Sequence, residues 1–363
     1  MADYIRTTIQ DLERFVVDVM KKLDVPEDDA KIVADVLIRA DRRGVESHGV
    51  ARLRRYVNGL KDGLMNPHPN IKIVKETPVS MLVDGDAGLG MVVTYNTMKK
   101  CIEKAKENYM CFAAIRNSNH YGIAGYYSLM ALEAGLIGFS VTNAAPLVVP
   151  TFGKDAALGT NPISFAVPAN KERPFVLDMA TSTVPRGKLE VYNRMGKKIP
   201  LSWATDENGA PTDNASLVLE NLKQRKGGGL LPLGGGEEET GGHKGYGLAM
   251  LVDILSGVFS GGAFGLNVYG KKNAPPNVCH FVGAIRPDTF VSEEELKDGM
   301  DGLIQMVKNA PKREGKDRIY IHGEKEFEKE EENQDTVPLY IKVYEDLAKI
   351  GEEFGIEPPT KVK

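Results

Sequence analysis

The feature of the sequence that most constrains the fold is a change of hydrophobic spacing at Pro67 and Pro69. Before these prolines, apolar residues recur every three or four positions, the period of helices that bury one face. After them, short apolar runs that end in glycine or polar residues alternate with further helical segments. The chain is therefore predicted to be an α/β protein whose N-terminal part is helical.

Composition and charge exclude several classes of protein. The 363 residues suffice for two or more domains, and 42% of them are hydrophobic. A net charge of −4 with mixed signs gives no reason to expect nucleic acid or an anionic membrane as partner. We expect no membrane span, no signal sequence and no metal-ligand cluster. Three scattered cysteines, with no disulfide framework, fit a cytoplasmic protein.

Three helices are expected in the first sixty residues. The first follows Thr8, which is placed to cap it, and the second begins at Pro26 and ends near Gly44. The third carries an apolar stripe over residues 50–60. Further helices are expected at residues 90–106, 124–134, 243–258, 296–307 and 339–354.

The residues between the second and third helices are those best suited to chemistry. His48 and Arg52 are four positions apart, so in a helix that starts at Ser47 they would lie on one face. The first turn of a helix also favours a neutral imidazole. An acid–base group beside a guanidinium that binds carboxylate is what reduction of a 2-oxo acid requires. The alternative is a helix start that Ser47 caps, with a solvated arginine.

Polar residues follow several of the expected strands, where α/β proteins usually build their binding sites. Strands are expected at residues 71–74, 79–83, 111–115, 136–141, 175–178, 280–285 and 319–327, with 280–285 at a sheet edge. His120, between Asn119 and Tyr121, follows one of these strands, and Asp178 ends another. From its position alone, His120 is equally well interpreted as a structural residue or as part of a binding site.

Two glycine-rich segments open helices. Residues 85–90 lack the full GxGxxG spacing, so a tight turn is the simpler interpretation. Lys244 lies at a glycine-rich helix start, which is a good place for a pyrophosphate, although a solvated lysine is the alternative. Together with Arg186 and Lys188, Lys244 favours NADPH over NADH, because cations can meet a 2′-phosphate.

Six segments, taken together and in order, resemble the malate/L-lactate dehydrogenase-like (type 2) family of NAD(P)-dependent oxidoreductases. They are Ser47-His48-Gly49 with Arg52, Asn119-His120, Gly159-Thr160-Asn161-Pro162, Asp178-Met179-Ala180-Thr181-Ser182, Gly242-His243-Lys244-Gly245 and Gly323-Glu324. The resemblance covers nearly the whole chain. It implies a non-Rossmann α/β cofactor-binding domain over residues 71–327, and a helical substrate and dimerisation domain formed by residues 1–70 with 328–363. It also implies a homodimer that uses NAD(H) or NADP(H).

The resemblance also implies a role for individual residues. The proton donor falls on His48, its relay partners fall on Ser47 and Asp178, and His120 is a second catalytic candidate. The implied substrate-binding residues are Arg52, which would clamp the carboxylate, and Thr160. The implied cofactor contacts are His120, Tyr121, Gly122, Ile123, Ala124, Asp178, Met179, Ala180, Thr181, Ser182, Lys244, Gly323, Glu324 and Lys325.

The implied reaction interconverts a 2-hydroxy acid, such as malate or lactate, and its 2-oxo acid. Hydride passes between the nicotinamide and the substrate carbon, while His48 moves the proton. Alternatives within the family are sulfolactate dehydrogenase and a reductase of a cyclic imine such as piperideine-2-carboxylate. A non-catalytic nucleotide-binding protein is a third alternative, which the joint presence of His48, Arg52 and Asp178 disfavours. A serine hydrolase is disfavoured because adjacent residues such as Ser47 and His48 do not easily form a nucleophile–base pair.

Overall fold

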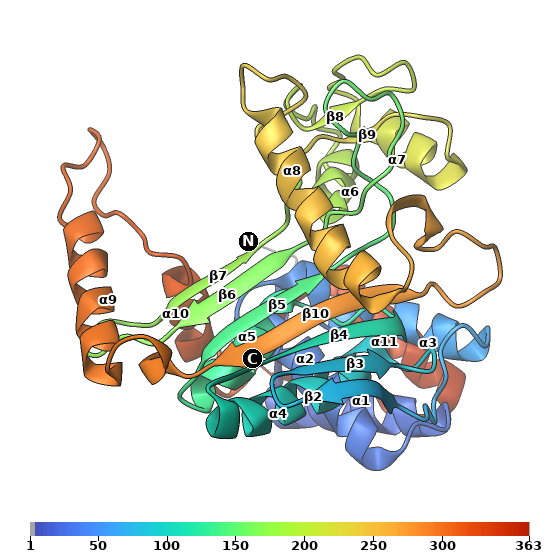
Figure 1. The fold of residues 1–363 in the computed structure, drawn as a ribbon. Coiled ribbons are helices and arrows are strands. Elements are labelled where there is room, and N and C mark those ends of the chain that lie inside the picture. The colour runs from blue at the N-terminus through green and yellow to red at the C-terminus, as the bar shows by residue number, and fades with distance from the viewer. Residues whose placement is uncertain (1–3, 363) are drawn as a thin grey trace.

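The computed structural model describes residues 4–362, and its main body is a seven-stranded sheet (Figure 1). In spatial order the strands are β2 (Lys72–Thr77), β3 (Ser80–Asp84), β4 (Met110–Ser118), β10 (Val278–Ile285), β5 (Ile137–Thr142), β6 (Ile163–Val167) and β7 (Phe175–Met179). Strands β3 and β4 run parallel, and the other neighbouring pairs of this sheet are antiparallel. The predicted α/β class is confirmed.

Strand β10 lies at the centre of the sheet, between β4 and β5, so its predicted place at an edge was wrong. The strand contains one polar residue, His280, whose imidazole is fully buried. His280 Nδ1 lies 2.7 Å from Thr142 Oγ1, and Nε2 lies 3.0 Å from Ser118 Oγ. Because both ring nitrogens have partners on the neighbouring strands, the central position is tolerated.

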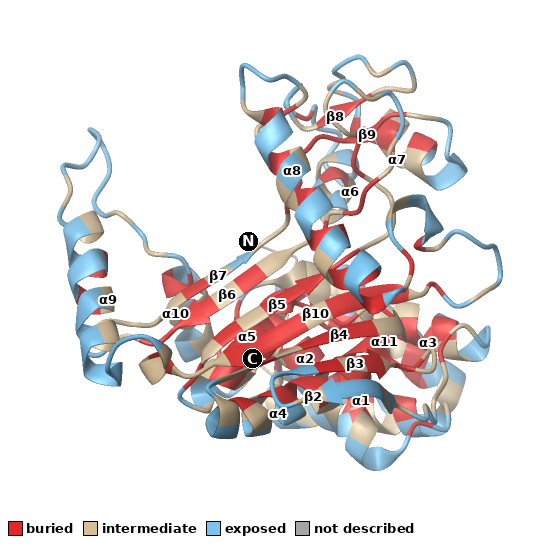
Figure 2. Cartoon of the chain, in the orientation of Figure 1, coloured by how far each residue is buried: buried red, intermediate tan, exposed pale blue. Residues whose placement is uncertain are grey.

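Helices gather on one face of the sheet (Figure 1). They are α1 (Ile9–Lys22), α2 (Glu27–Arg42), α3 (Leu53–Lys61), α4 (Gly90–Asn108), α5 (Ala124–Glu133) and α11 (Ile341–Phe354). Their inner faces are buried and their outer faces exposed (Figure 2). As predicted, Thr8 caps α1, its hydroxyl accepting the Asp11 N–H at 3.2 Å, and α2 ends just before Gly44, which has φ +73°.

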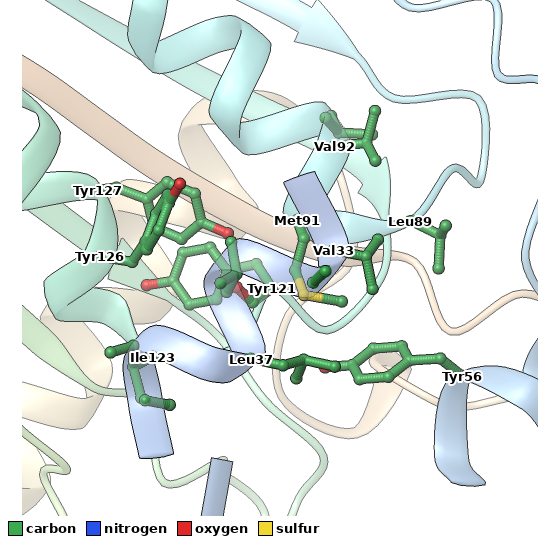
Figure 3. Packing of buried hydrophobic residues seen from close by; sticks show 14 of the residues in the cluster. Val33, Leu37, Tyr56, Leu89, Met91, Val92, Tyr121, Ile123, Tyr126 and Tyr127 are labelled. Atoms are coloured by element: carbon green, nitrogen blue, oxygen red, sulfur yellow. The ribbon is translucent and has the colours of Figure 1, made fainter. Parts of the chain in front are cut away.

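The N-terminal helices and the sheet share one hydrophobic core. Figure 3 shows Leu37 of α2 beside Tyr56 of α3. Tyr127 packs between the rings of Tyr121 and Tyr126, at centroid distances of 4.7 and 5.4 Å. The core therefore ties the segment that carries His48 to the start of α5, next to the sheet.

The N-terminal part is not wholly helical. Strand β1 (Tyr4–Thr8) pairs antiparallel with β11 (Thr336–Tyr340) and β12 (Lys361–Val362) in a separate three-stranded sheet. The strand predicted at 319–327 was also wrong, because residues 319–321 are irregular and α10 (Glu324–Glu332) begins after Gly323. Gly323 has φ +95°, which ends any extended run, and the following glutamates and lysines favour a helix.

A further lobe has a small core of its own above the sheet in Figure 1. It contains α6 (Arg186–Arg194), β8 (Ala204–Thr205), α7 (Ala215–Gln224), β9 (Gly229–Leu230) and α8 (Gly242–Asp253). A π-helical turn, Ile254–Val258, extends α8 towards β10. The apolar stripe predicted for this helix is only partly covered, since Leu251 is 46% and Val258 51% exposed, whereas Val252 is fully buried.

Helix α9 (Glu293–Lys308) stands apart at the left of Figure 1. Within residues 4–362, none of the helices combines the length and apolar character needed to cross a membrane.

Candidate active site

A cavity of about 480 Å³ lies where β7, the start of α5 and residues 320–326 meet the segment after α2. This volume is within the range of about 300–1,000 Å³ that is typical of ligand and cofactor sites. Ser47 and His48 line one wall, Ile123 to Gly125 a second, and Asp178 to Ala180 a third. The cavity therefore brings together four of the six segments that the sequence singled out.

His48 does not lie on a helix that begins at Ser47, so that expectation was wrong. Residues Glu46–His48 form one short 3₁₀ turn and Val50–Arg52 a second, with α3 starting at Leu53. The two turns are separated by Gly49, whose backbone is extended at φ −81° and ψ −152°.

The physical reason for this break is the buried carboxyl group of Asp41. Its Oδ2 accepts the Val50 N–H at 2.8 Å, and a Cβ atom on Gly49 would lie 1.9 Å from its Oδ1. Burial raises the pKa of Asp41 well above its ordinary value. The carboxyl therefore fits only against a glycine, and it fixes the backbone on the C-terminal side of His48.

The Ser47 hydroxyl lies 2.9 Å from His48 Nδ1, so adjacency in sequence does not prevent this contact. This contact fixes the orientation of the His48 ring, so Nε2 is the ring nitrogen that remains free to bind another partner. Burial, followed by the charges of Arg52 and Arg55, lowers the pKa of His48 to about 4. The neutral imidazole expected from the sequence is thus supported, but its cause is burial and two guanidinium groups rather than a helix start.

Arg52 lies next to this pair but outside the cavity wall. Its Nε donates to the Ser47 carbonyl oxygen at 2.6 Å, which leaves its two terminal nitrogens for another partner. The first turn of α6 packs close by, since a Cβ atom on Gly187 would lie 3.6 Å from Ser47 Cβ and 3.9 Å from Arg52 Nη2. The predicted spacing thus does bring imidazole and guanidinium together, through Ser47 rather than along a helix.

The imidazole rings of His48 and His120 are stacked, with centroids 5.7 Å apart and planes inclined by 17°. The Tyr56 hydroxyl lies 2.7 Å from His120 Nδ1, and the Gly122 N–H donates to the same nitrogen at 3.3 Å. Burial, then the charge of Arg55, lowers the pKa of His120 well below its ordinary value. Tyr56 was not predicted from the sequence, although it follows Arg52 by only four positions.

Asp178 lines the cavity and is exposed on that side, while protein atoms surround its carboxyl group elsewhere. Its Oδ2 accepts the Gly125 N–H at 2.8 Å, in the first turn of α5. Burial raises the pKa of Asp178 to about 6, against the opposing effect of that hydrogen bond. Within residues 4–362, no hydrogen bond links Asp178 to Ser47 or His48.

The other predicted contacts divide into two groups. Those that line the cavity are Gly122, Ile123, Ala124, Thr160, Met179, Ala180, Gly323 and Lys325. The remaining predicted contacts have partners elsewhere in the protein or are exposed. Tyr121 packs on His280, and the Thr181 and Ser182 hydroxyls donate to backbone carbonyls. Glu324 pairs with Lys308 and Arg318, and Lys244 is exposed at the start of α8. Further lining residues missed by the sequence analysis include Arg43, Tyr320 and Glu326, two of which flank the Gly323 motif.

A histidine that faces a cavity, is held by a serine hydroxyl and feels the charges of two arginines is suited to acid–base chemistry beside an anion. The family model for malate/L-lactate dehydrogenases matches residues 7–348. The chain therefore belongs to this family, which implies a nicotinamide cofactor, and the resemblance indicated by the motifs is confirmed.

Individual relatives agree with this assignment. The chain is 51% identical to a malate dehydrogenase of Pyrococcus abyssi over 356 residues, which cover 98% of this chain and 96% of the relative. It is 41% identical to an L-sulfolactate dehydrogenase of Methanocaldococcus jannaschii, over 95% and 96% of the two chains. The solved structure of the malate dehydrogenase from Pyrococcus horikoshii OT3 matches with a TM-score of 0.89 at 47% identity, over 99% and 98%.

Proposed function

We propose that the protein is an NAD(P)-dependent dehydrogenase that interconverts malate and its 2-oxo acid, oxaloacetate. The observation that carries the proposal is the Ser47–His48 pair, at the wall of a cavity of cofactor size and beside two guanidinium groups. The identity of 51% to a malate dehydrogenase over nearly the whole chain supports malate as the substrate.

The cavity wall fits a nicotinamide cofactor, which supplies or accepts the hydride when bound. Gly122 and Gly323 have φ +84° and +95°, and a Cβ atom on Gly323 would lie 2.9 Å from Val176 Cβ. A Cβ atom on Gly122 would likewise lie 2.6 Å from Val36 Cγ1, so glycine at both places lets the cavity wall pack closely on its protein neighbours. The first turn of α5 also opens on the cavity, where its Gly125 N–H donates to Asp178 Oδ2.

The residues of the chain then supply the proton and the orientation. In oxidation, neutral His48 takes the proton of the substrate hydroxyl, and in reduction it returns that proton to the carbonyl oxygen. Ser47 keeps the ring in place through Nδ1. The terminal nitrogens of Arg52 bind the substrate carboxylate, and this orientation supplies a large part of the rate gain. Thr160 and His120 are proposed to face the substrate as well.

Both NADH and NADPH are candidate cofactors. Arg186 pairs with Glu190 at 3.1 Å, and Lys188 lies over the ring of Trp203, so neither favours a 2′-phosphate as the sequence suggested. The cavity offers Lys325, which would favour NADPH, and Glu326, which would favour the free ribose hydroxyl of NADH.

We also propose the division of the chain into a substrate side, residues 1–70 with 328–363, and a cofactor side, residues 71–327. Its support is that His48 and Arg52 belong to the first part, whereas Asp178 and Gly323 belong to the second. A sheet that is mostly antiparallel supports a cofactor domain that is not a Rossmann fold, in which parallel strands dominate. The three cysteines are free thiols, as expected of a cytoplasmic protein.

A homodimer is proposed from the sheet face opposite the helices. The rings of Phe112, Phe139 and Phe281 pack together there. Phe259, at the end of the π-helical turn, joins them at 6.3 Å from Phe281 and is 60% exposed. A second copy of the chain is the occupant that we propose for this apolar surface.

The test is a panel of oxaloacetate, pyruvate, sulfopyruvate and piperideine-2-carboxylate, each reduced with NADH and with NADPH. Oxaloacetate is expected to give the highest kcat/KM, and His48→Ala is expected to lower kcat at least ~100-fold while cofactor binding, measured by fluorescence titration, persists. A preference for sulfopyruvate would make the protein a sulfolactate dehydrogenase, and a preference for the cyclic imine would make it an imine reductase. Cofactor binding without turnover of any of the four would overturn the enzyme proposal.

A further inference from the structure

We infer that Arg55 selects substrates that carry a second acid group, by binding the carboxylate or sulfonate on the carbon next to the reacting centre. The inference rests on the proposed function and names the residue that sets its substrate range.

The first turn of α3 is built around the two histidines. Arg52 contacts the Ser47 carbonyl oxygen, and Tyr56 holds His120 through its hydroxyl. Arg55 lies between them in sequence, three positions after Arg52, which is the residue that precedes the first turn of α3. The turn that positions both imidazole rings therefore also presents two cations.

Neither cation is neutralised by the protein. Among residues 4–362, no carboxylate oxygen lies within 4.0 Å of the guanidinium of Arg52 or Arg55. Glu190, the acid that acts most on Arg52, is paired with Arg186 instead. By contrast, the adjacent Arg54 pairs with Asp346 at 3.1 Å and with Glu353 at 2.7 Å.

The partner that Arg55 does have is neutral. Its Nη2 donates to the Tyr269 hydroxyl, and its guanidinium lies 5.7 Å from the centroid of that ring. Tyr269 is itself fixed, because its N–H donates to the Pro276 carbonyl oxygen and its own carbonyl oxygen accepts from Arg225 Nη2 at 2.9 Å. The hydroxyl thus orients the half-buried Arg55 while leaving its charge free for an anion.

The charge of Arg55 also reaches the reacting groups. After burial, it is the largest cause that lowers the pKa of His120, and it contributes to the lowered pKa of His48. This effect agrees with the place of Arg55 beside Tyr56, whose hydroxyl lies 2.7 Å from His120 Nδ1.

Substrate chemistry accounts for two cations. Malate carries a carboxylate on its hydroxyl-bearing carbon and a second acid group on the next carbon, and sulfolactate has a sulfonate at that second place. Arg52 would take the first group and Arg55 the second, whereas lactate has nothing to offer Arg55. Burying two like charges side by side is costly unless an anion compensates them, so a dianionic substrate is the better match.

The experiment compares oxaloacetate with pyruvate in Arg55→Gln, with Arg54→Gln as the matched control. The ratio of kcat/KM for oxaloacetate to that for pyruvate is expected to fall ~30-fold in Arg55→Gln, as for loss of a hydrogen bond to a charged group. It should stay at the wild-type value in Arg54→Gln. An unchanged ratio in Arg55→Gln, or an equal loss for both acids, would overturn the inference.

A second variant covers the case in which Arg55→Gln fails to fold. Tyr269→Phe removes only the hydroxyl that orients Arg55, and it should lower the same ratio by a smaller factor, whereas an unchanged ratio in this folded variant would overturn the inference. A wild-type enzyme that reduces neither acid would overturn the proposed function instead, so the two failures are distinguishable.

Discussion

At the scale of single residues, the state of His48 is set by its neighbours. Burial and the two guanidinium groups disfavour the imidazolium, so in the free enzyme the ring is a base ready to accept a proton. A bound dianion would offset the charges of Arg52 and Arg55, and would thereby help His48 to hold the proton that reduction needs.

The titration of His48 is a direct prediction. With a pKa of about 4, the protonated fraction falls roughly tenfold for each pH unit above that value. Histidine NMR of the ligand-free enzyme should therefore show one resonance that titrates near pH 4 and that disappears in His48→Gln. Arg55→Gln removes one cause of the lowered pKa and should move the midpoint upwards. A midpoint at 6.5 or above in the wild-type enzyme would contradict the described environment.

Residue types were easier to predict than residue contacts. His48 and Arg52 could be singled out because proton transfer and carboxylate binding require those side chains within a short stretch of sequence. Tyr56 and Asp41 could not, because each acts through a partner that the fold brings from another element. The contacts of Asp178 likewise depend on α5, which precedes it by some fifty residues.

At the scale of elements, the two short turns that carry His48 depend on Gly49. The Asp41 carboxyl group occupies the place that a side chain at position 49 would need. The break between the two turns therefore results from the packing of Asp41 against Gly49 and not from a low helix propensity of the sequence.

Gly49→Ala tests this requirement. The added methyl group should lower the free energy of unfolding by about 1–3 kcal/mol, as overpacking does, and should lower kcat/KM about 100-fold by displacing His48. Gly299→Ala and Gly302→Ala in α9 are matched controls, since a Cβ atom there meets nothing within 4 Å. Both controls should keep full activity and an unchanged or slightly raised Tm. Equal behaviour of all three variants would contradict the role assigned to Gly49.

Elements with strong local periodicity were predicted well, and those defined by distant partners were not. Helices α1, α2, α4 and α5 begin and end within a few residues of their expected bounds, because capping residues and apolar spacing are local signals. The place of β10 depends on β4 and β5, which lie more than a hundred residues earlier in the chain. The local sequence of β10 does not predict which strands it pairs with.

At the scale of the whole molecule, the proposed dimer predicts how surface substitutions act. Phe259→Glu places a charge on the apolar sheet face and should shift the enzyme from two chains towards one in sedimentation equilibrium, because an unpaired charge in an interface is costly. Phe290→Glu is the control, since Phe290 is 87% exposed just before α9. Dissociation by Phe290→Glu but not by Phe259→Glu would place the interface elsewhere.

The pairing of β1 with β11 and β12 has a consequence for the order in which the enzyme is made. A ribosome releases His48 and Arg52 early, but residues 320–326, which line the cavity, and the strands that join β1 emerge more than 250 residues later. Because contacts so distant in sequence form slowly, the growing chain holds His48, the proposed proton-transferring group, long before it has a binding site. Catalysis must therefore wait until the segment that includes residues 320–326 has been synthesised.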